Sequence, residues 1–65
     1  MKKVLIHKNG GNPVYIARCD ERIYYVIYQD KSMSSHRTIG LAIANANNEY
    51  IMNSPAAIYG WLSYQ

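Results

Sequence analysis

The stretch that decides the fold is Val14–Gln29, which has the sequence VYIARCDERIYYVIYQ. Most of its residues are β-branched or aromatic, and such side chains suit a pleated strand better than a helix. Asp20 and Glu21 lie between the two apolar runs and are polar enough to form a tight turn. The stretch therefore predicts two antiparallel strands folded back on each other.

A two-residue turn at Asp20-Glu21 would place Cys19 opposite Arg22, and directly opposed residues share a face of the sheet. The face expected to point toward the core is largely aliphatic and consists of Val14, Ile16, Arg18, Ile23, Tyr25 and Ile27. The opposite face is expected to hold a tyrosine cluster, made of Tyr15, Ala17, Cys19, Tyr24, Val26 and Tyr28. A turn longer by one residue would shift the pairing and mix the two sets.

A further short strand is expected before this hairpin, at Lys3–His7. Asn9–Pro13 separates the two and contains an Asn-Gly pair, which is a strong signal for a tight turn. Residues 1–30 thus predict a three-stranded antiparallel meander. Because a meander places its second strand in the middle, the third strand, Tyr24–Gln29, is expected to be an edge.

The next segment, Asp30–Ser35, is polar and is expected to be a connection, in which Ser34 or Ser35 caps a helix. Apolar residues then recur at steps of three and four, which favours a helix over Arg37–Asn47. A competing strand signal comes from the alternation of Ile39, Leu41 and Ile43. Helix is preferred because the intervening alanines have high helix propensity.

A second helix is expected at Pro55–Tyr64, with Ser54 as its N-cap. The predicted fold is α+β, a three-stranded antiparallel β-meander followed by two short helices packed on one sheet face, in a single domain over residues 1–65. The residues expected to be mostly buried in the core are Ile16, Ile27, Ile43 and Trp61.

The length and composition restrict the ways in which this chain can be stable. With 65 residues and one cysteine it cannot contain an internal disulfide, and its histidines, cysteine and carboxylates do not cluster as metal ligands do. The sequence is 49% hydrophobic with seven tyrosines, more than two short helices can cover. A homodimer with two-fold symmetry is therefore expected, through the edge of the third strand or through the tyrosine face.

The apolar runs are too short for a signal peptide or a membrane span, and an unpaired cysteine suits a reducing compartment. We therefore expect a cytoplasmic protein with no membrane partner. The net charge is +3, and from position 32 onward only Arg37 and Glu49 are charged. The excess positive charge thus belongs to the strands and their loops, where its simplest role is solubility.

Nothing in the sequence predicts an enzyme or a cofactor. His7 and His36 have no nucleophile beside them in the sequence, and the acidic neighbours of Cys19 disfavour a reactive thiolate. Asp20 and Glu21 are adjacent, so on a strand they would point to opposite faces and could not act as an acid–base pair.

The candidate binding residues are the tyrosines and arginines of the hairpin, Tyr15, Arg18, Arg22, Tyr24 and Tyr28. Tyrosine and arginine are enriched at protein–protein hot spots, which favours a protein-binding regulator or inhibitor, a profile typical of small accessory proteins of phages and mobile elements. The alternative is a nucleic-acid-binding module in which the tyrosines stack on unpaired bases. A third possibility is that the tyrosines only line a wet sheet face.

Overall fold

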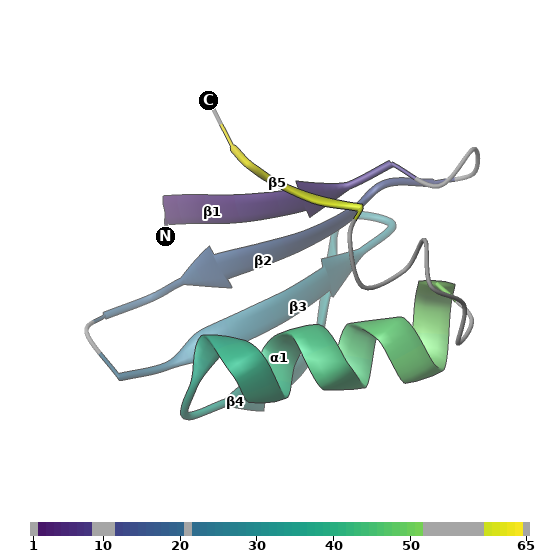
Figure 1. Cartoon of the computed structure of the whole chain (residues 1–65). Coiled ribbons are helices and arrows are strands. Elements are labelled where there is room, and N and C mark those ends of the chain that lie inside the picture. The colour runs from purple at the N-terminus through teal and green to yellow at the C-terminus, as the bar shows by residue number, and fades with distance from the viewer. Residues whose placement is uncertain (1, 9–11, 21, 52–59, 65) are drawn as a thin grey trace.

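The computed structural model of the chain describes residues 2–8, 12–20, 22–51 and 60–64. They form an antiparallel five-stranded sheet in the order β4-β3-β2-β1-β5, with a helix against one face (Figure 1). The strands are β1 (Lys2–His7), β2 (Val14–Arg18), β3 (Tyr24–Tyr28), β4 (Lys31–His36) and β5 (Trp61–Ser63). Helix α1 spans Ile39–Ala46 and continues into a π-helical turn, η1, over Asn47–Ile51. The predicted α+β class and the meander are confirmed, and the sheet gains two strands that were not expected.

The β2–β3 hairpin is closed by a longer connection than the sequence suggested. Arg18 pairs with Tyr24, and the connection between them is closed by a hydrogen bond from the Cys19 amide to the Ile23 carbonyl at 3.1 Å. Within it the Arg22 amide donates to Asp20 Oδ1 at 2.8 Å. The predicted pairing of Cys19 with Arg22 is therefore wrong by one residue.

This one-residue difference divides the hairpin residues differently between the two faces of the sheet. The face that packs on α1 holds Val14, Ile16, Arg18, Tyr24, Val26 and Tyr28. The opposite face holds Tyr15, Ala17, Tyr25 and Ile27. The prediction of a single tyrosine face is therefore wrong, because the sheet separates Tyr15 from Tyr24 and Tyr28. Ile27, expected in the core, is half-buried on the face away from the helix.

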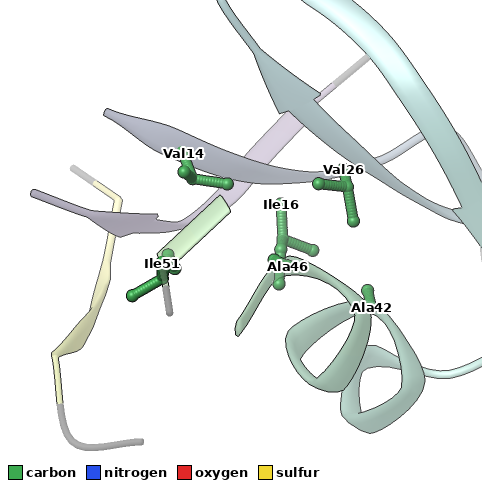
Figure 2. Packing of buried hydrophobic residues seen from close by; sticks show 6 residues of the cluster. All are labelled: Val14, Ile16, Val26, Ala42, Ala46 and Ile51. Atoms are coloured by element: carbon green, nitrogen blue, oxygen red, sulfur yellow. The ribbon is translucent and has the colours of Figure 1, made fainter. Parts of the chain in front are cut away.

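The core is a thin layer between α1 and the central strands (Figure 2). Ile16 and Val26, both fully buried, face the helix side that carries Ala42 and Ala46. Alanine projects only a methyl group, so the helix can lie close to the sheet without a void. Ile51, in the π-helical turn, extends this layer toward β1 and β5. The expected burial of Ile16 is confirmed, whereas Ile43 is only half-buried.

The segment expected to be a polar connection is the edge strand β4. It follows a two-residue turn in which Gln29 and Asp30 have positive φ angles of 53° and 61°. Two such residues form the hairpin turn whose twist matches that of the flanking strands. Strand β4 was not predicted, because its serines are neither β-branched nor aromatic.

Both edges of the sheet differ from the prediction, because β3 lies between β2 and β4 and is not an edge. One edge is β4, which begins with Lys31 and contains a bulge at Met33. The other is β5, which has only three residues. A lysine, a bulge and a short strand all discourage pairing with another chain. The expected route to a dimer through the edge of Tyr24–Gln29 is therefore wrong.

Helix α1 lies within the predicted range and begins two residues later than expected. Its N-cap is Thr38, whose Oγ1 accepts a hydrogen bond from the Leu41 amide at 3.1 Å. Neither Ser34 nor Ser35 caps the helix, because both belong to β4.

The C-terminal segment is tied back to the helix by a tryptophan. Trp61 lies in β5, so the predicted second helix is wrong over residues 60–64, and its part over residues 55–59 falls outside the described residues. The Trp61 indole N–H donates to Asn47 Oδ1 at 2.9 Å, and its ring meets His7 edge-on at 5.3 Å. Trp61 is half-buried and packs against the core cluster, so the expectation that it contributes to the core holds in part.

The close approach of α1 to the sheet predicts that Ala46→Leu destabilises the protein. Three additional carbon atoms at this fully buried site would push the helix away, at a cost of about 1–3 kcal/mol in the free energy of unfolding. Ala44 is exposed on the same helix, so Ala44→Leu is the matched control and should change stability by less than about 0.5 kcal/mol. Urea denaturation followed by circular dichroism measures both. Equal effects of the two variants would contradict this packing.

Candidate functional site

The face of the sheet turned away from α1 is rich in aromatic and aliphatic side chains. We call it the distal face and define it by Lys3, Ile6, Tyr15, Tyr25, Ile27, Leu62 and Tyr64. Helix α1 contacts β2, β3 and β4 from the other side, and no helix of the described residues covers the distal face. Leu62 is 62% exposed and Tyr64 is 43% exposed. The other residues of the distal face are half-buried, and Ala17 on the same side is fully buried. The apolar area open to solvent is therefore concentrated at β5.

An aromatic pair with a lysine above it orders one part of the distal face. The rings of Tyr15 and Tyr64 meet edge-on, with centroids 5.9 Å apart. Lys3 Nζ lies 4.2 Å from the Tyr15 ring centroid and 5.5 Å from that of Tyr64, at distances where a cation is attracted to an aromatic face. The Tyr64 amide donates to the Val4 carbonyl at 3.0 Å and holds the pair against β1.

A hollow of about 510 Å³ lies beside this pair, where β1 meets β5. It is lined by Ile6, Lys8, Leu62, Ser63 and Tyr64. A hollow lined by both apolar and polar side chains resembles the recesses that receive single anchor side chains in protein interfaces. The distal face thus combines exposed aromatic area with a concave point of attachment.

Positive charge gathers elsewhere, at the end of the sheet where β1 begins. Lys2 pairs with Arg18, Arg18 with Tyr24, and Tyr24 with His36, so these four residues form one row across four strands. Arg22 and Arg37 lie in the adjacent β2–β3 and β4–α1 connections, which reach the same end (Figure 1). We call the group Lys2, Arg18, Arg22, His36 and Arg37 the basic end.

A cleft of about 770 Å³ opens at the basic end, lined by Arg22, Ile23, Ser35, His36 and Arg37. The imidazole of His36 is fixed by a short chain of hydrogen bonds to the helix. Ser34 Oγ donates to Asn45 Oδ1 at 3.0 Å and lies 2.9 Å from His36 Nε2. The hydroxyl has one proton, already used toward Asn45, so it accepts from His36 and Nε2 carries the ring hydrogen.

The structure separates the five candidate residues predicted from the sequence. Arg18, Arg22 and Tyr24 come together at the basic end. Tyr15 lies on the distal face. Tyr28 lies at the far end of β3, where it stacks on Tyr50 with centroids 4.7 Å apart and packs against the core. Whether these residues contact a partner stays a prediction.

Several residues of both surfaces were not predicted from the sequence. Leu62 and Tyr64 were assigned to a helix, although they flank the polar Ser63, and this short alternation is also typical of a strand. Tyr25 was placed in the core because of the shifted hairpin register. His36 and Arg37 join the basic end only because the unpredicted β4 returns the chain to that end of the sheet.

The described part of the chain holds no group of three or more His, Cys, Asp or Glu side chains arranged for a metal ion. Cys19 is exposed and unpaired. His7 is 4% exposed, and within the described residues neither ring nitrogen has a hydrogen-bond partner. No described helix is long and apolar enough to cross a membrane.

Comparison of the chain with models of protein families, with curated proteins and with solved structures gives no match in any of the three. The two surfaces described above are therefore the basis on which a function can be proposed.

The lysine above the aromatic pair predicts a measurable coupling. Lys3→Met keeps the apolar stem and removes the charge, while Tyr15→Leu removes the ring. A double-mutant cycle of unfolding free energies should give a coupling of about 0.5–1 kcal/mol between the two side chains. Lys8→Met with Tyr15→Leu is the control cycle and should show no coupling. A zero value for the Lys3 cycle would mean that the ammonium does not rest on the ring.

Proposed function

We propose that this chain is a small non-enzymatic binding protein that contacts another protein through its distal face, as a regulator or inhibitor. The observation that carries the proposal is the exposure of large apolar side chains there, with Leu62 at 62% and Tyr64 at 43%. Contiguous exposed apolar area of this kind is typical of protein interaction sites. Tyrosine suits such a surface, because its ring supplies contact area and its hydroxyl tolerates water.

A face is a better candidate for the contact than an edge of the sheet. The β4 edge carries Lys31 and the bulge at Met33, and β5 is too short to offer a long row of free backbone groups. The hollow between β1 and β5 gives the distal face a place for an anchor side chain of the partner.

The chemistry of the distal face favours a protein over a nucleic acid at that surface. Lys3 is its only defining residue with a charge, and its ammonium already lies over Tyr15 and Tyr64. Strands that bind single-stranded nucleic acid combine stacking rings with several cations along the phosphate backbone. A nucleic-acid-binding module remains the second candidate, and the observation that favours it is the basic end, where Arg18, Arg22 and Tyr24 come together.

The partner could be a second copy of the chain, because a face with a single positive charge offers little repulsion to its own copy. We therefore keep a homodimer as one form of the proposal, with the distal face as the contact. We expect the contact to form in the cytoplasm, where an exposed free cysteine such as Cys19 stays reduced. We also expect an origin in a phage or mobile element, whose accessory proteins are typically small.

Replacing Leu62 with a charged residue tests the proposal, and the same replacement at an exposed leucine of the helix is the control. Leu62→Glu places a carboxylate on the distal face, and Leu41→Glu places one on α1, where Leu41 is 56% exposed. We expect Leu62→Glu to weaken the contact by about tenfold or more, since hot-spot changes cost about 2 kcal/mol, and Leu41→Glu to change it by less than about twofold. Partner proteins are captured from the source cell with the parent, identified, purified and measured by calorimetry against each variant.

Sedimentation of the purified parent and of the same two variants gives the corresponding answer for self-association. The proposal is contradicted if Leu41→Glu abolishes the contact while Leu62→Glu leaves it intact, because the contact would then lie on α1. It is also contradicted if the parent neither self-associates at about 1 mM, where contacts of about 4 kcal/mol register, nor captures a protein that Leu62→Glu loses.

A further inference from the structure

We propose that the cleft at the basic end binds a phosphate group. This site is separate from the distal face and would exist whether or not the distal face contacts a protein. Its walls come from two connections far apart in the sequence, with Arg22 between β2 and β3 and Arg37 between β4 and α1. The ligand would therefore bind between the β2–β3 connection and the β4–α1 connection.

The distribution of charge along the sheet is uneven and gives the first argument. Four of the seven lysines and arginines of the chain belong to the basic end: Lys2, Arg18, Arg22 and Arg37. Asp20 and Glu21 are the acidic residues of the same connection in the sequence, so this end carries an excess of two positive charges. At the other end of the strands, Lys8 and Lys31 are balanced by Asp30 and Glu49. A phosphate monoester carries a charge of about −1.5 to −2, which matches the local excess.

The chemistry of the cleft lining gives the second argument. A guanidinium presents a planar fork of N–H donors that matches two oxygens of one phosphate group. Asp20 accepts a hydrogen bond from the Arg22 backbone amide through Oδ1, and Asp20 is not among the residues that line the cleft. The cleft of about 770 Å³ lies within the range of about 300–1,000 Å³ typical of small-ligand sites, which leaves room for an organic group on the phosphate.

A polar side chain in this cleft, His36, is already fixed in orientation. Two hydrogen bonds in series, from His36 Nε2 to Ser34 Oγ and from Ser34 Oγ to Asn45 Oδ1, anchor the imidazole to α1. This contact at Nε2 holds the ring in one orientation at the wall of the cleft. A side chain that is already held in place loses less entropy on binding than one that must first be ordered.

A titration followed by two-dimensional NMR tests the site with three defined probes: inorganic phosphate, a nucleoside monophosphate and a single-stranded 12-nucleotide DNA, at about 50 mM salt. We expect saturable shifts at the amides of Arg22, Ser35 and Arg37. The variant Arg22→Gln/Arg37→Gln should weaken binding by about tenfold or more, because it removes two charge-assisted contacts. The control Lys8→Gln/Lys31→Gln removes the same charge from the other end and should weaken binding by less than about twofold.

The probes also distinguish the source of the phosphate. Equal affinity for the mononucleotide and the DNA at the same salt would identify a small phosphorylated ligand. Much tighter binding of DNA, falling steeply with salt, would identify a nucleic-acid backbone that also contacts Lys2 and Arg18. Either result supports the site. In a Leu62→Glu background, phosphate affinity should still depend on Arg22 and Arg37. This result would separate the phosphate site from the distal-face contact.

Two results would overturn the site. One is the absence of saturable shifts with all three probes. The other is an equal loss of affinity in the two double variants, which would mean that only the net charge of the chain matters. If Arg22→Gln/Arg37→Gln does not fold, Arg22→Lys/Arg37→Lys keeps the charge but loses the planar fork, and a loss of about threefold or more is then the expected result. Unchanged affinity in that variant would count against the site.

Discussion

The whole arrangement depends on the packing of one helix against one side of the sheet, through Ala42 and Ala46 on the helix and Ile16 and Val26 on the strands. This contact is small, because two of its four partners are alanines, and it lies over the central strands. A single short helix cannot cover both faces of a five-stranded sheet. The distal face follows from that limit: the apolar residues that alternate with the core residues have no described helix to pack against.

The register of the β2–β3 hairpin decides which tyrosines belong to which surface. With Arg18 opposite Tyr24, the rings of Tyr24 and Tyr28 go to the helix side, and those of Tyr15 and Tyr25 go to the distal face. A shift of β3 by one residue against β2 would move Tyr24 and Tyr28 to the side of Tyr15 and move Tyr25 to the helix side. The fold class and the positions of β1, β2 and β3 could be predicted, because β-branched and aromatic residues mark these strands. The register could not, because it depends on the Cys19–Ile23 connection, whose polar residues fit turns of more than one length.

For the two candidate surfaces too, some residues could be predicted from the sequence and others could not. The proximity of Arg18, Arg22 and Tyr24 could be predicted, since all three belong to one hairpin. The contributions of His36 and Arg37 could not, because they require β4, an edge strand whose serines give no strand signal. Leu62 and Tyr64 reach the distal face through β5, and only its pairing with β1 places Tyr64 against Tyr15. Long-range pairing of short polar or three-residue strands leaves little trace in local sequence.

The central claim is that the helix packs on the Ile16 and Val26 side of the sheet and leaves the other side open. Nuclear Overhauser effects from the methyl protons of Ala42 and Ala46 test this directly, because they report only protons within about 5 Å, close to the reach of side chains in contact. The structure predicts contacts from these methyls to Ile16 and Val26, and none to Tyr25 or Ile27. Contacts from either alanine to Tyr25 or Ile27 would show that the helix lies on the other face, and would contradict both the register and the distal face defined from it.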